Sequence, residues 1–286
     1  MSTLTAESLL TPEQIESFHR DGFVVARQLL SPDEVATIRD TFMEMNANGP
    51  VPGLSEMRHG SVDQGGYPVT DPLRFYPRMM HPHRHPDKPV GPLAFRYMID
   101  ARVKSILAEL MGEDPIAVQS MFYFKPPGAR GQDFHQDNFY LRVKPGTCMA
   151  AWMAIDDCDE QNGGMACVRN TANYDTQCPT AADPTKFFTT EHVEPPPGMV
   201  PETVVMKAGD VLFFNGQTIH GSTPNTSATR FRRSLICHYV PRSTKEMSHW
   251  YEAFDFDGSR IPIKTNEDGG PCGTPNDVAM GGGSPH

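Results

Sequence analysis

Residues 207–225 have the sequence KAGDVLFFNGQTIHGSTPN, which is the most informative stretch of the chain for the fold. It predicts a turn at Gly209, a buried strand over residues 211–214 and a second turn that leads to His220. Similar short apolar runs, separated by Gly and Pro, follow one another from residue 115 onward. The predicted strands cover residues 116–124, 139–143, 149–155, 165–168, 202–206, 211–214 and 232–240. Such a series is typical of a β-sandwich or jelly roll.

The segment before residue 115 has the pattern of helices instead. Thr11 and Ser31 each precede a Pro, with Gln14 and Glu34 three positions after the respective cap, so both are predicted to begin capped helices. These helices are expected to run to about residues 19 and 45, with a short strand over residues 23–26 between them and a third helix over residues 97–111. Helices followed by many strands favour the α+β class.

We therefore expect a single domain over residues 1–286. Residues 1–114 would form a helical part and a covering loop, and the helices would pack on one sheet of a jelly-roll core over residues 115–245. Residues 246–286 would be a C-terminal extension, with a loose tail after residue 260. Two segments rich in Pro, over residues 47–92 and 171–201, are expected to be long loops.

Composition excludes several classes of function. The net charge of −10 argues against a nucleic-acid or anionic-membrane partner, because such surfaces need clustered Lys and Arg. The 286 residues can bury a core without disulfides, and the six Cys include no CxxC pair. The chain begins without the pattern of a signal peptide, and no apolar run approaches 18 residues. We expect a soluble cytoplasmic protein, a monomer or homodimer, that acts on a small molecule.

Three residues have the types and spacing of a metal site. His135 and Asp137 stand at positions i and i+2 of a predicted extended segment, so their side chains point to the same side. His220 is a candidate third ligand from the later turn. Two imidazoles and one carboxylate on one face form the facial triad of non-haem Fe(II) oxygenases, which leaves positions for a chelating co-substrate and for O₂.

A cluster of arginines follows the distal histidine. Arg230, Arg232 and Arg233 precede or begin the predicted strand over residues 232–240. An Arg at the inner start of that strand can bind a carboxylate through two hydrogen bonds. The period of two places Arg232 on the same face as Ser234 and Ile236, with Arg233 opposite.

These blocks together resemble the phytanoyl-CoA dioxygenase (PhyH) family of Fe(II)/2-oxoglutarate-dependent oxygenases. The resemblance extends over residues 14–239 and rests on FHQDNFY, WMAIDDCDEQNGGM, KAGDVLFFNGQTIHGSTPN and FRRSLICHY. It implies a double-stranded β-helix, a cupin-like fold, with N-terminal helices. It also implies Fe(II) on His135, Asp137 and His220, and a 2-oxoglutarate carboxylate bound by Arg232 with help from Ser222.

The resemblance assigns further roles around this site. Trp152 matches a family tryptophan near 2-oxoglutarate, and the strand before residue 125 places Met121 and Lys125 at the co-substrate and Gln119 towards the substrate. The long N-terminal loop of the family often covers the active site. Its candidate substrate contacts here are Tyr76, Arg78, His83 and Arg84.

Two features depart from the family pattern. The arginine usually comes one residue sooner after the distal histidine, so Arg230 is an alternative to Arg232 as the carboxylate ligand. The usual PGSH after the Gly-Gly turn is replaced by residues 168–171, VRNT, which changes one wall of the pocket. Residues 81–85, HPHRH, are a weaker candidate for a second metal site, and we interpret them as a loop that is solvated or faces the substrate.

The implied activity is oxidation, most simply hydroxylation, of a small organic molecule, coupled to decarboxylation of 2-oxoglutarate to succinate and CO₂. Asp137 favours hydroxylation or desaturation over halogenation, because related halogenases have Gly or Ala there. The ectoine-hydroxylase pattern is not present after the HxD motif, and no Arg/Lys-rich stretch suggests CoA phosphates, which favours a role in natural-product biosynthesis. The alternative is a cupin-like isomerase or sensor that binds metal without oxygenase activity.

Overall fold

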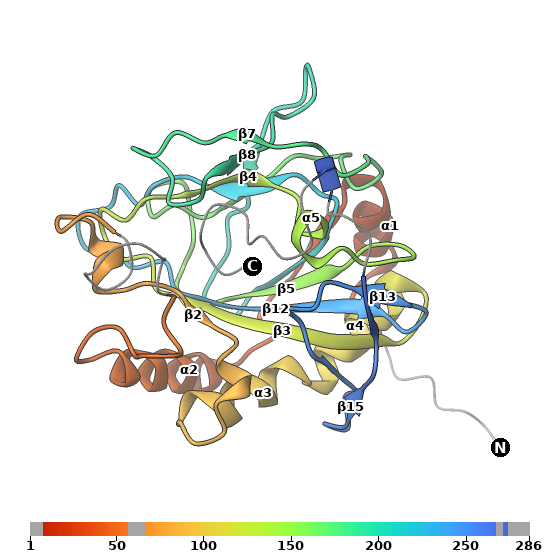
Figure 1. The fold of residues 1–286 in the computed structure, drawn as a ribbon, viewed down its shortest axis with the longest axis horizontal. Helices are drawn as coiled ribbons and strands as arrows, with labels where there is room; N and C mark the ends of the chain where they lie inside the picture. The colour runs from red at the N-terminus through yellow and green to blue at the C-terminus, as the bar shows by residue number, and fades with distance from the viewer. Residues whose placement is uncertain (1–7, 57–66, 267–270, 274–286) are drawn as a thin grey trace.

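The computed structural model describes residues 8–56, 67–266 and 271–273, which form two larger antiparallel sheets, two two-stranded sheets and a group of helices (Figure 1). The larger sheet has the order β1 (Phe23–Ala26), β10 (Val211–Asn215), β5 (Met149–Ala154), β12 (Ser234–Pro241), β3 (Pro115–Tyr123), β14 (Ala253–Phe254) and β15 (Arg260–Ile261), and β2 (Met79–Met80) also pairs with β3. The smaller sheet has the order β4 (Gln132–His135), β11 (His220–Ser222), β6 (Met165–Cys167) and β9 (Glu202–Thr203). The chain is therefore a mixed protein of helices and antiparallel sheets.

Four helices of nine to fourteen residues precede β3 in the chain. They are α1 (Pro12–Asp21), α2 (Pro32–Met45), α3 (Val90–Met98) and α4 (Ala101–Met111). Capping boxes at Thr11 and Ser31 begin the first two, as predicted. Among the described residues, no helix is both long enough and apolar enough to cross a bilayer.

The alternation of side chains in the larger sheet separates two apolar clusters. Ala151 and Met153 of β5 pack with residues from all four helices, whereas Trp152 of the same strand packs on the inner side with Met165 of the smaller sheet. Because consecutive residues of one strand belong to different clusters, the inner side chains point into the space between the two sheets. The site described below lies in that space.

Several predicted elements differ in the structure. The helix expected over residues 97–111 is two helices, because Asp100 accepts a hydrogen bond from the backbone N–H of Arg102 and caps α4, while Tyr97 belongs to α3. The strand expected over residues 139–143 is wrong: it is the short helix α5 (Asn138–Leu141), which begins directly after Asp137. The alternating apolar residues Phe139, Leu141 and Val143 are all buried in the structure. An apolar run this short does not distinguish a helix from a strand.

The other strands are found close to their predicted positions. β9 is shorter than the 202–206 prediction, and β12 begins at Ser234, so Arg232 lies just before the strand. The two long loops contain short elements: the 3₁₀ helices η1 (Pro72–Arg74) and η2 (Pro82–Arg84) in the first, and the paired strands β7 (Thr180–Ala181) and β8 (Glu191–His192) in the second.

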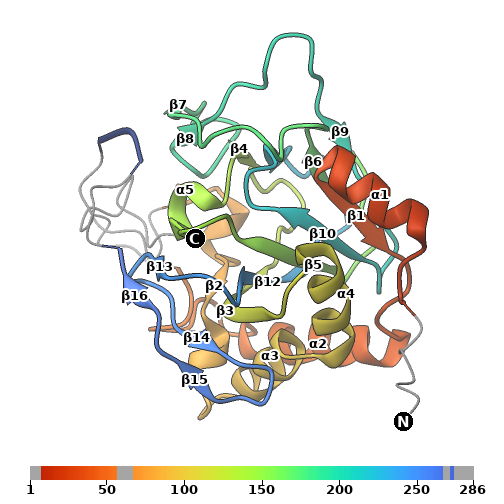
Figure 2. The ribbon, with the colours of Figure 1, turned by 90° about the vertical axis from the view of Figure 1, so that its right-hand side faces the viewer.

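The C-terminal extension is more ordered than expected over its described part. β13 (Glu246–Met247) pairs in parallel with β16 (Lys264–Thr265), and Figure 2 places these strands at the opposite end of the molecule from α1. Cys272 of η3 (Pro271–Gly273) forms a disulfide with Cys178, 94 residues earlier, although a chain of this length does not need one. Cys148, Cys158, Cys167 and Cys237 are free and buried. The rest of the predicted tail, residues 267–270 and 274–286, lies outside the described residues.

Candidate active site

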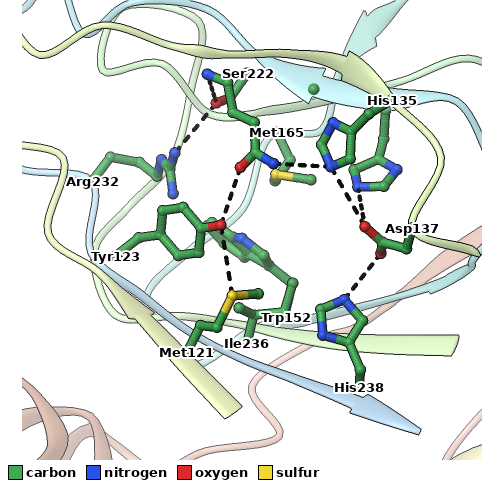
Figure 3. Close-up of a pocket in the computed structure, with 13 residues that line it drawn as sticks. Met121, Tyr123, His135, Asp137, Trp152, Met165, Ser222, Arg232, Ile236 and His238 are labelled. Atoms are coloured by element: carbon green, nitrogen blue, oxygen red, sulfur yellow. Dashed lines mark hydrogen bonds and ion pairs between the residues drawn. The ribbon is translucent and has the colours of Figure 1, made fainter. Parts of the chain in front are cut away.

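A partly open cavity lies between the two sheets (Figure 3). Its walls come from β3, β4, β5, β6, β11 and β12 and from the segments that adjoin them. The lining residues are Met121, Tyr123, Gln132, His135, Asp137, Trp152, Met165, His220, Gly221, Ser222, Arg232, Ile236 and His238. Seven of the site residues predicted from the sequence therefore line this cavity. An eighth, Lys125, is hydrogen-bonded to Ser222 in its wall.

The three predicted metal ligands meet at one end of the cavity. His220 of β11 is the direct cross-strand partner of His135 at the end of β4, and Asp137 follows two residues later. The Nε2 atoms of His135 and His220 each lie 3.5 Å from Oδ1 of Asp137, and one ligand atom from each of the three residues lies within 4.8 Å of the other two. Within the described residues this is the one group of three such side chains placed to hold a metal ion.

Backbone contacts orient both imidazoles for ligation. Nδ1 of His135 lies 2.7 Å from the carbonyl of Asp133, and Nδ1 of His220 lies 2.9 Å from that of Thr218. Because a carbonyl only accepts, each Nδ1 carries the hydrogen, and in the neutral ring the lone pair is on Nε2. Both Nε2 atoms face the carboxylate. The donor set of two neutral imidazoles and one carboxylate suits a divalent iron ion.

Asp137 is buried but is held in its charged form. Burial opposes its ionisation, yet the neighbouring His220 and His238 outweigh this and hold the pKa of Asp137 well below its ordinary value. Nε2 of His238, on β12, lies 3.0 Å from Oδ2 of Asp137. Since this hydrogen bond occupies Oδ2, Oδ1 stays directed at the two ligand histidines, an arrangement typical of the groups that support metal ligands.

Two buried basic side chains lie at or beside the other end of the cavity. Arg232 donates from Nε to the carbonyl of Gly163 at 3.0 Å and from Nη1 to Oγ of Ser234 at 3.2 Å. Lys125 donates from Nζ to the same Gly163 carbonyl at 3.0 Å and to Oγ of Ser222 at 2.8 Å. Among the described residues neither basic side chain forms a salt bridge with a carboxylate, so both, held only by neutral acceptors, remain available to an anionic ligand.

Gly163 makes this arrangement sterically feasible. Its φ is +69°, and a Cβ there would lie 2.8 Å from Nζ of Lys125 and 2.4 Å from the carbonyl oxygen of Thr223. Any other residue would displace the lysine or the backbone. Trp152 closes the same end, with its ring centroid 5.3 Å from Cζ of Arg232.

A chain of hydrogen bonds joins His135 to a buried ion pair. Nε2 of Gln132 lies 3.0 Å from Nε2 of His135, and Oε1 of Gln132 accepts from the hydroxyl of Tyr123 at 3.1 Å. The Tyr123 oxygen in turn accepts from Nη1 of Arg78 at 2.9 Å. Arg78 forms a two-point ion pair with Glu56, at 2.7 and 2.8 Å, and both side chains are buried. This chain fixes which end of the Gln132 amide faces the histidine.

The structure places the remaining predicted residues outside the main cavity. Tyr76 and Arg78 line a second, smaller pocket, which shares Tyr123 and Arg232 with the first. His83 bonds to Oγ of Ser120 at 2.7 Å and packs on Phe254, towards the helical layer.

Arg84 and the alternative Arg230 lie at other positions. Arg84 donates to the carbonyl of Trp250. Arg230 forms a two-point ion pair with Asp159 near the surface, so the geometry favours Arg232 over Arg230 as the anion ligand. Gln119 is fully buried beside His238 on the inner face of β3.

Sequence reasoning missed Gln132 and His238, and it did not assign a role to Tyr123. Tyr123 shares the inward face of β3 with Met121, and His238 shares that of β12 with Ile236, so the period of two could have indicated both. No local pattern marks Gln132.

The PhyH (phytanoyl-CoA dioxygenase) sequence profile matches residues 18–234. The chain belongs to the phytanoyl-CoA dioxygenase family. Phytanoyl-CoA dioxygenase 1 of Oryza sativa subsp. japonica is 25% identical over 264 residues, which cover 84% of this chain and 92% of the rice protein.

Solved structures have the same fold. The non-heme alpha ketoglutarate dependent carbocyclase SnoK from nogalamycin biosynthesis superposes with a TM-score of 0.63 at 21% identity, over 84% of this chain and 88% of SnoK. The epimerase SnoN in complex with Fe³⁺, alpha ketoglutarate and nogalamycin RO gives 0.60 at 20% identity, over 82% of this chain and 84% of SnoN.

Proposed function

We propose that this protein is an Fe(II)/2-oxoglutarate-dependent dioxygenase that hydroxylates a small organic molecule and converts 2-oxoglutarate to succinate and CO₂. The observation that carries the proposal is the placement of Arg232 in the same cavity as the cluster of His135, Asp137 and His220. Lys125 is hydrogen-bonded to Ser222 of the cavity wall, and neither basic side chain pairs with a carboxylate among the described residues. A dianion that binds the cations at one end can reach a metal at the other. A metal-binding isomerase or sensor has no need of the cationic end.

In this mechanism the protein supplies position, charge and exclusion of water. His135, Asp137 and His220 would hold the iron, which when bound with 2-oxoglutarate and O₂ supplies the oxidising power for the substrate C–H bond. His238 keeps the Asp137 carboxylate oriented. Arg232, Lys125 and Ser222 bind the distal carboxylate of 2-oxoglutarate, and the buried wall formed by Trp152 and Met121 excludes water from it.

The proposal extends to the architecture. We infer a single PhyH-type domain in which the two sheets form a double-stranded β-helix and the N-terminal helices support the larger sheet. The strand orders and the apolar cluster shared by helices and sheet support this inference. The nogalamycin enzymes among the structural neighbours support a substrate from natural-product biosynthesis.

The experiment is an assay of succinate formation by the purified protein with Fe(II), 2-oxoglutarate, ascorbate and O₂. We expect slow succinate release without substrate and faster release with a correct substrate from a panel. The matched variant is His135→Ala, which removes one predicted ligand, and Arg230→Ala is a surface control. Equal succinate formation by the wild type and His135→Ala would contradict the assignment of the metal site.

The outcome of the oxidation needs a separate measurement, because the neighbouring structures include a carbocyclase and an epimerase. Mass spectrometry of the product separates the cases. A gain of one oxygen atom supports hydroxylation, loss of two hydrogens indicates cyclisation or desaturation, and an unchanged mass with altered stereochemistry indicates epimerisation.

A further inference from the structure

The six cysteines, all in the described part of the chain, fall into two groups. The free and buried ones are Cys148, Cys158, Cys167 and Cys237. Burial is the main reason that the pKa of each of these thiols lies above its ordinary value, so they stay protonated near neutral pH. Cys178 and Cys272 are exposed and joined in a disulfide. The sulfur chemistry open to a reductant in solution is therefore confined to this one bond.

The residue before Cys178 is bonded to the segment that carries two of the candidate metal ligands. The backbone N–H of Gln177 donates to Oε1 of Gln136 at 2.6 Å. Gln136 is fully buried and stands between His135 and Asp137 in the chain. The position of this segment is therefore coupled to the position of the first half-cystine through a single hydrogen bond.

The same group of hydrogen bonds reaches the third candidate ligand. Nε2 of Gln136 donates to the carbonyl of Gln217 at 2.9 Å, and the hydroxyl of Thr176 donates to Oε1 of Gln217 at 3.1 Å. Gln217 lies three residues before His220, in the turn between β10 and β11. Residues 175–177 therefore connect the turn that leads to the distal histidine with the segment that carries the other two ligands.

The second half-cystine belongs to the C-terminal extension, which contacts the ligand segment from another part of the chain. The backbone N–H of Ser248 donates to the carbonyl of Leu141 at 2.8 Å. Leu141 ends α5, the helix that begins directly after Asp137. The disulfide thus joins two regions, with its cysteines 94 residues apart, that are each hydrogen-bonded to the surroundings of the candidate ligands.

We propose that the Cys178–Cys272 disulfide is a redox switch for the metal site. The closed bond holds residues 175–177 against Gln136 and keeps the three candidate ligands in one arrangement, whereas its reduction loosens that arrangement and weakens metal binding. The chain is large enough to fold without a crosslink, which leaves the bond free for this role.

The reductant for this switch is a dithiol. One of its thiolates attacks a sulfur of the Cys178–Cys272 bond and releases the other cysteine as a thiol, and its second thiol then displaces the remaining cysteine. Two electrons and two protons pass to the two cysteines, and the reductant becomes a disulfide. That metal binding is the property controlled rests on the proposed function, whereas the loosening of residues 175–177 does not.

Hydrogen exchange gives the first test, with the full-length protein free of metal. One sample is kept oxidised, and the other is reduced with dithiothreitol and desalted under argon. We expect exchange of the Gln177 backbone amide, measured by NMR, to become at least about tenfold faster on reduction, because only its hydrogen bond to Gln136 then restrains it. The amide of Leu30, bonded to the carbonyl of Gly209, is the control and should not change. Equal exchange of Gln177 in the two samples would overturn the proposal.

Metal affinity gives the second test, in the same two samples and under argon. Co(II) is titrated by calorimetry, without 2-oxoglutarate or substrate. Reduction should raise the dissociation constant of Co(II) by about 2- to 10-fold, the equivalent of one net hydrogen bond, and reoxidation with glutathione disulfide should restore it. A dissociation constant that is the same in the oxidised and reduced protein would overturn the control of the metal site by this bond.

Variants identify the cysteines that respond. Cys272→Ser should have the exchange and Co(II) affinity of the reduced protein without any reductant, and dithiothreitol should change neither. The matched control is Cys237→Ala, which removes a buried free thiol and should respond to reduction as the wild type does. A response to dithiothreitol that persists in Cys272→Ser would overturn the proposal, because another group would then be its source.

The succinate assay separates this proposal from the proposed function. Redox-dependent exchange and Co(II) binding in a protein that forms no succinate would refute the oxygenase function and leave the switch intact. Succinate formation by a protein whose Co(II) affinity does not depend on the disulfide would refute the switch alone.

Discussion

Two buried polar regions, one around Lys125 and Arg232 and the other around Gln119 and His238, differ in which interactions their side chains lack. At the end formed by Lys125 and Arg232, every donor group that the structure pairs is held by a neutral acceptor, and what is missing is a counter-charge. Around Gln119 and His238, the Gln119 amide and Nδ1 of His238 have no hydrogen-bond partner within the part of the chain that the structure describes, although Nε2 of His238 is bonded to Asp137. The first region therefore suits an anion, whereas the second lacks hydrogen bonds rather than a counter-charge. Four predictions test this division, from the largest expected effect to the smallest.

Asp137 stands between the two ends, in contact with both the ligand histidines and His238. Asp137→Ala should lower the rate of succinate formation by at least about 100-fold, because even partners outside the metal's ligand shell account for 10- to 100-fold effects. Circular dichroism checks that the variant is folded, and Asp157→Ala, at an exposed ion pair with Lys207, is the control. An unchanged rate of succinate formation in Asp137→Ala would contradict the assignment of this carboxylate as a metal ligand.

Arg232→Ala tests the anionic preference of the first end. We expect the KM for 2-oxoglutarate to rise about 10- to 100-fold, since a hydrogen bond to a charged group contributes about 1.5–3 kcal/mol. Arg232→Lys should recover part of the loss, because lysine keeps the charge but not the planar pair of donors. Arg230→Ala, at the Asp159 ion pair, should leave the KM unchanged, and an equal effect of the two alanine variants would contradict the division.

Gln132→Leu tests whether the Gln132 amide competes with a metal ion for Nε2 of His135. The Gln132 amide bonds to the Nε2 atom of His135 that a metal needs. Its removal should therefore lower the dissociation constant of Co(II), used as an air-stable probe, by about 2- to 10-fold, the worth of one net hydrogen bond. Tyr123→Phe, which frees the other end of the amide, should act in the same direction and more weakly. Weaker Co(II) binding in both variants would show instead that Gln132 supports the bound metal.

Lys125 predicts a small pH dependence at the cationic end. Its burial, with the charge of Arg232 adding to the effect, lowers the pKa of Lys125 well below the ordinary 10.5. A bound carboxylate favours the ammonium form and raises the pKa of Lys125 in the complex. Binding of 2-oxoglutarate therefore takes up a proton at pH values between the lowered pKa of the ligand-free protein and the higher pKa of the complex, and the affinity falls as pH rises through that window. Calorimetry in two buffers of different ionisation enthalpy counts the proton, and Lys125→Met should remove it.

The lowered pKa of Lys125 also affects the stability of the ligand-free protein, but with the opposite dependence on pH. Between the lowered pKa of the folded protein and the ordinary 10.5 of the unfolded chain, the unfolded chain binds more protons than the folded chain, so the stability of the ligand-free protein should rise with pH. The rise should be absent in Lys125→Met. A fall in stability over the window would show that the lysine is charged and paired in the folded protein.

The sequence predicted the elements whose signals are local. The capping boxes of α1 and α2 and the apolar strands β5 and β10 are found within a few residues of their expected positions. The failure at α5 has a physical cause: the chain must turn immediately after Asp137, and this tertiary requirement overrides the alternating pattern of residues 139–143.

The candidate site likewise contains residues that the sequence could group and contacts that it could not predict. His135, Asp137, His220 and Arg232 stand in motifs with fixed spacing, so the sequence was enough to group them. The contact of Gln132 with His135 depends on which atoms meet in the folded chain, and so does the lack of a hydrogen-bond partner for Gln119 among the described residues. No spacing in the sequence encodes either feature. The pairing of Cys178 with Cys272 was equally inaccessible, because six cysteines allow many connectivities.

That disulfide closes a covalent ring that contains His220, Arg232 and His238, whereas His135 and Asp137 lie outside it. A protease that cut the long loop between residues 179 and 201 would therefore separate the candidate iron ligands onto two polypeptides that are still one molecule. The cleaved protein should run as a single species on a non-reducing gel and as two fragments after reduction. Its succinate formation could survive the cut and be lost on dilution only when the bridge is opened.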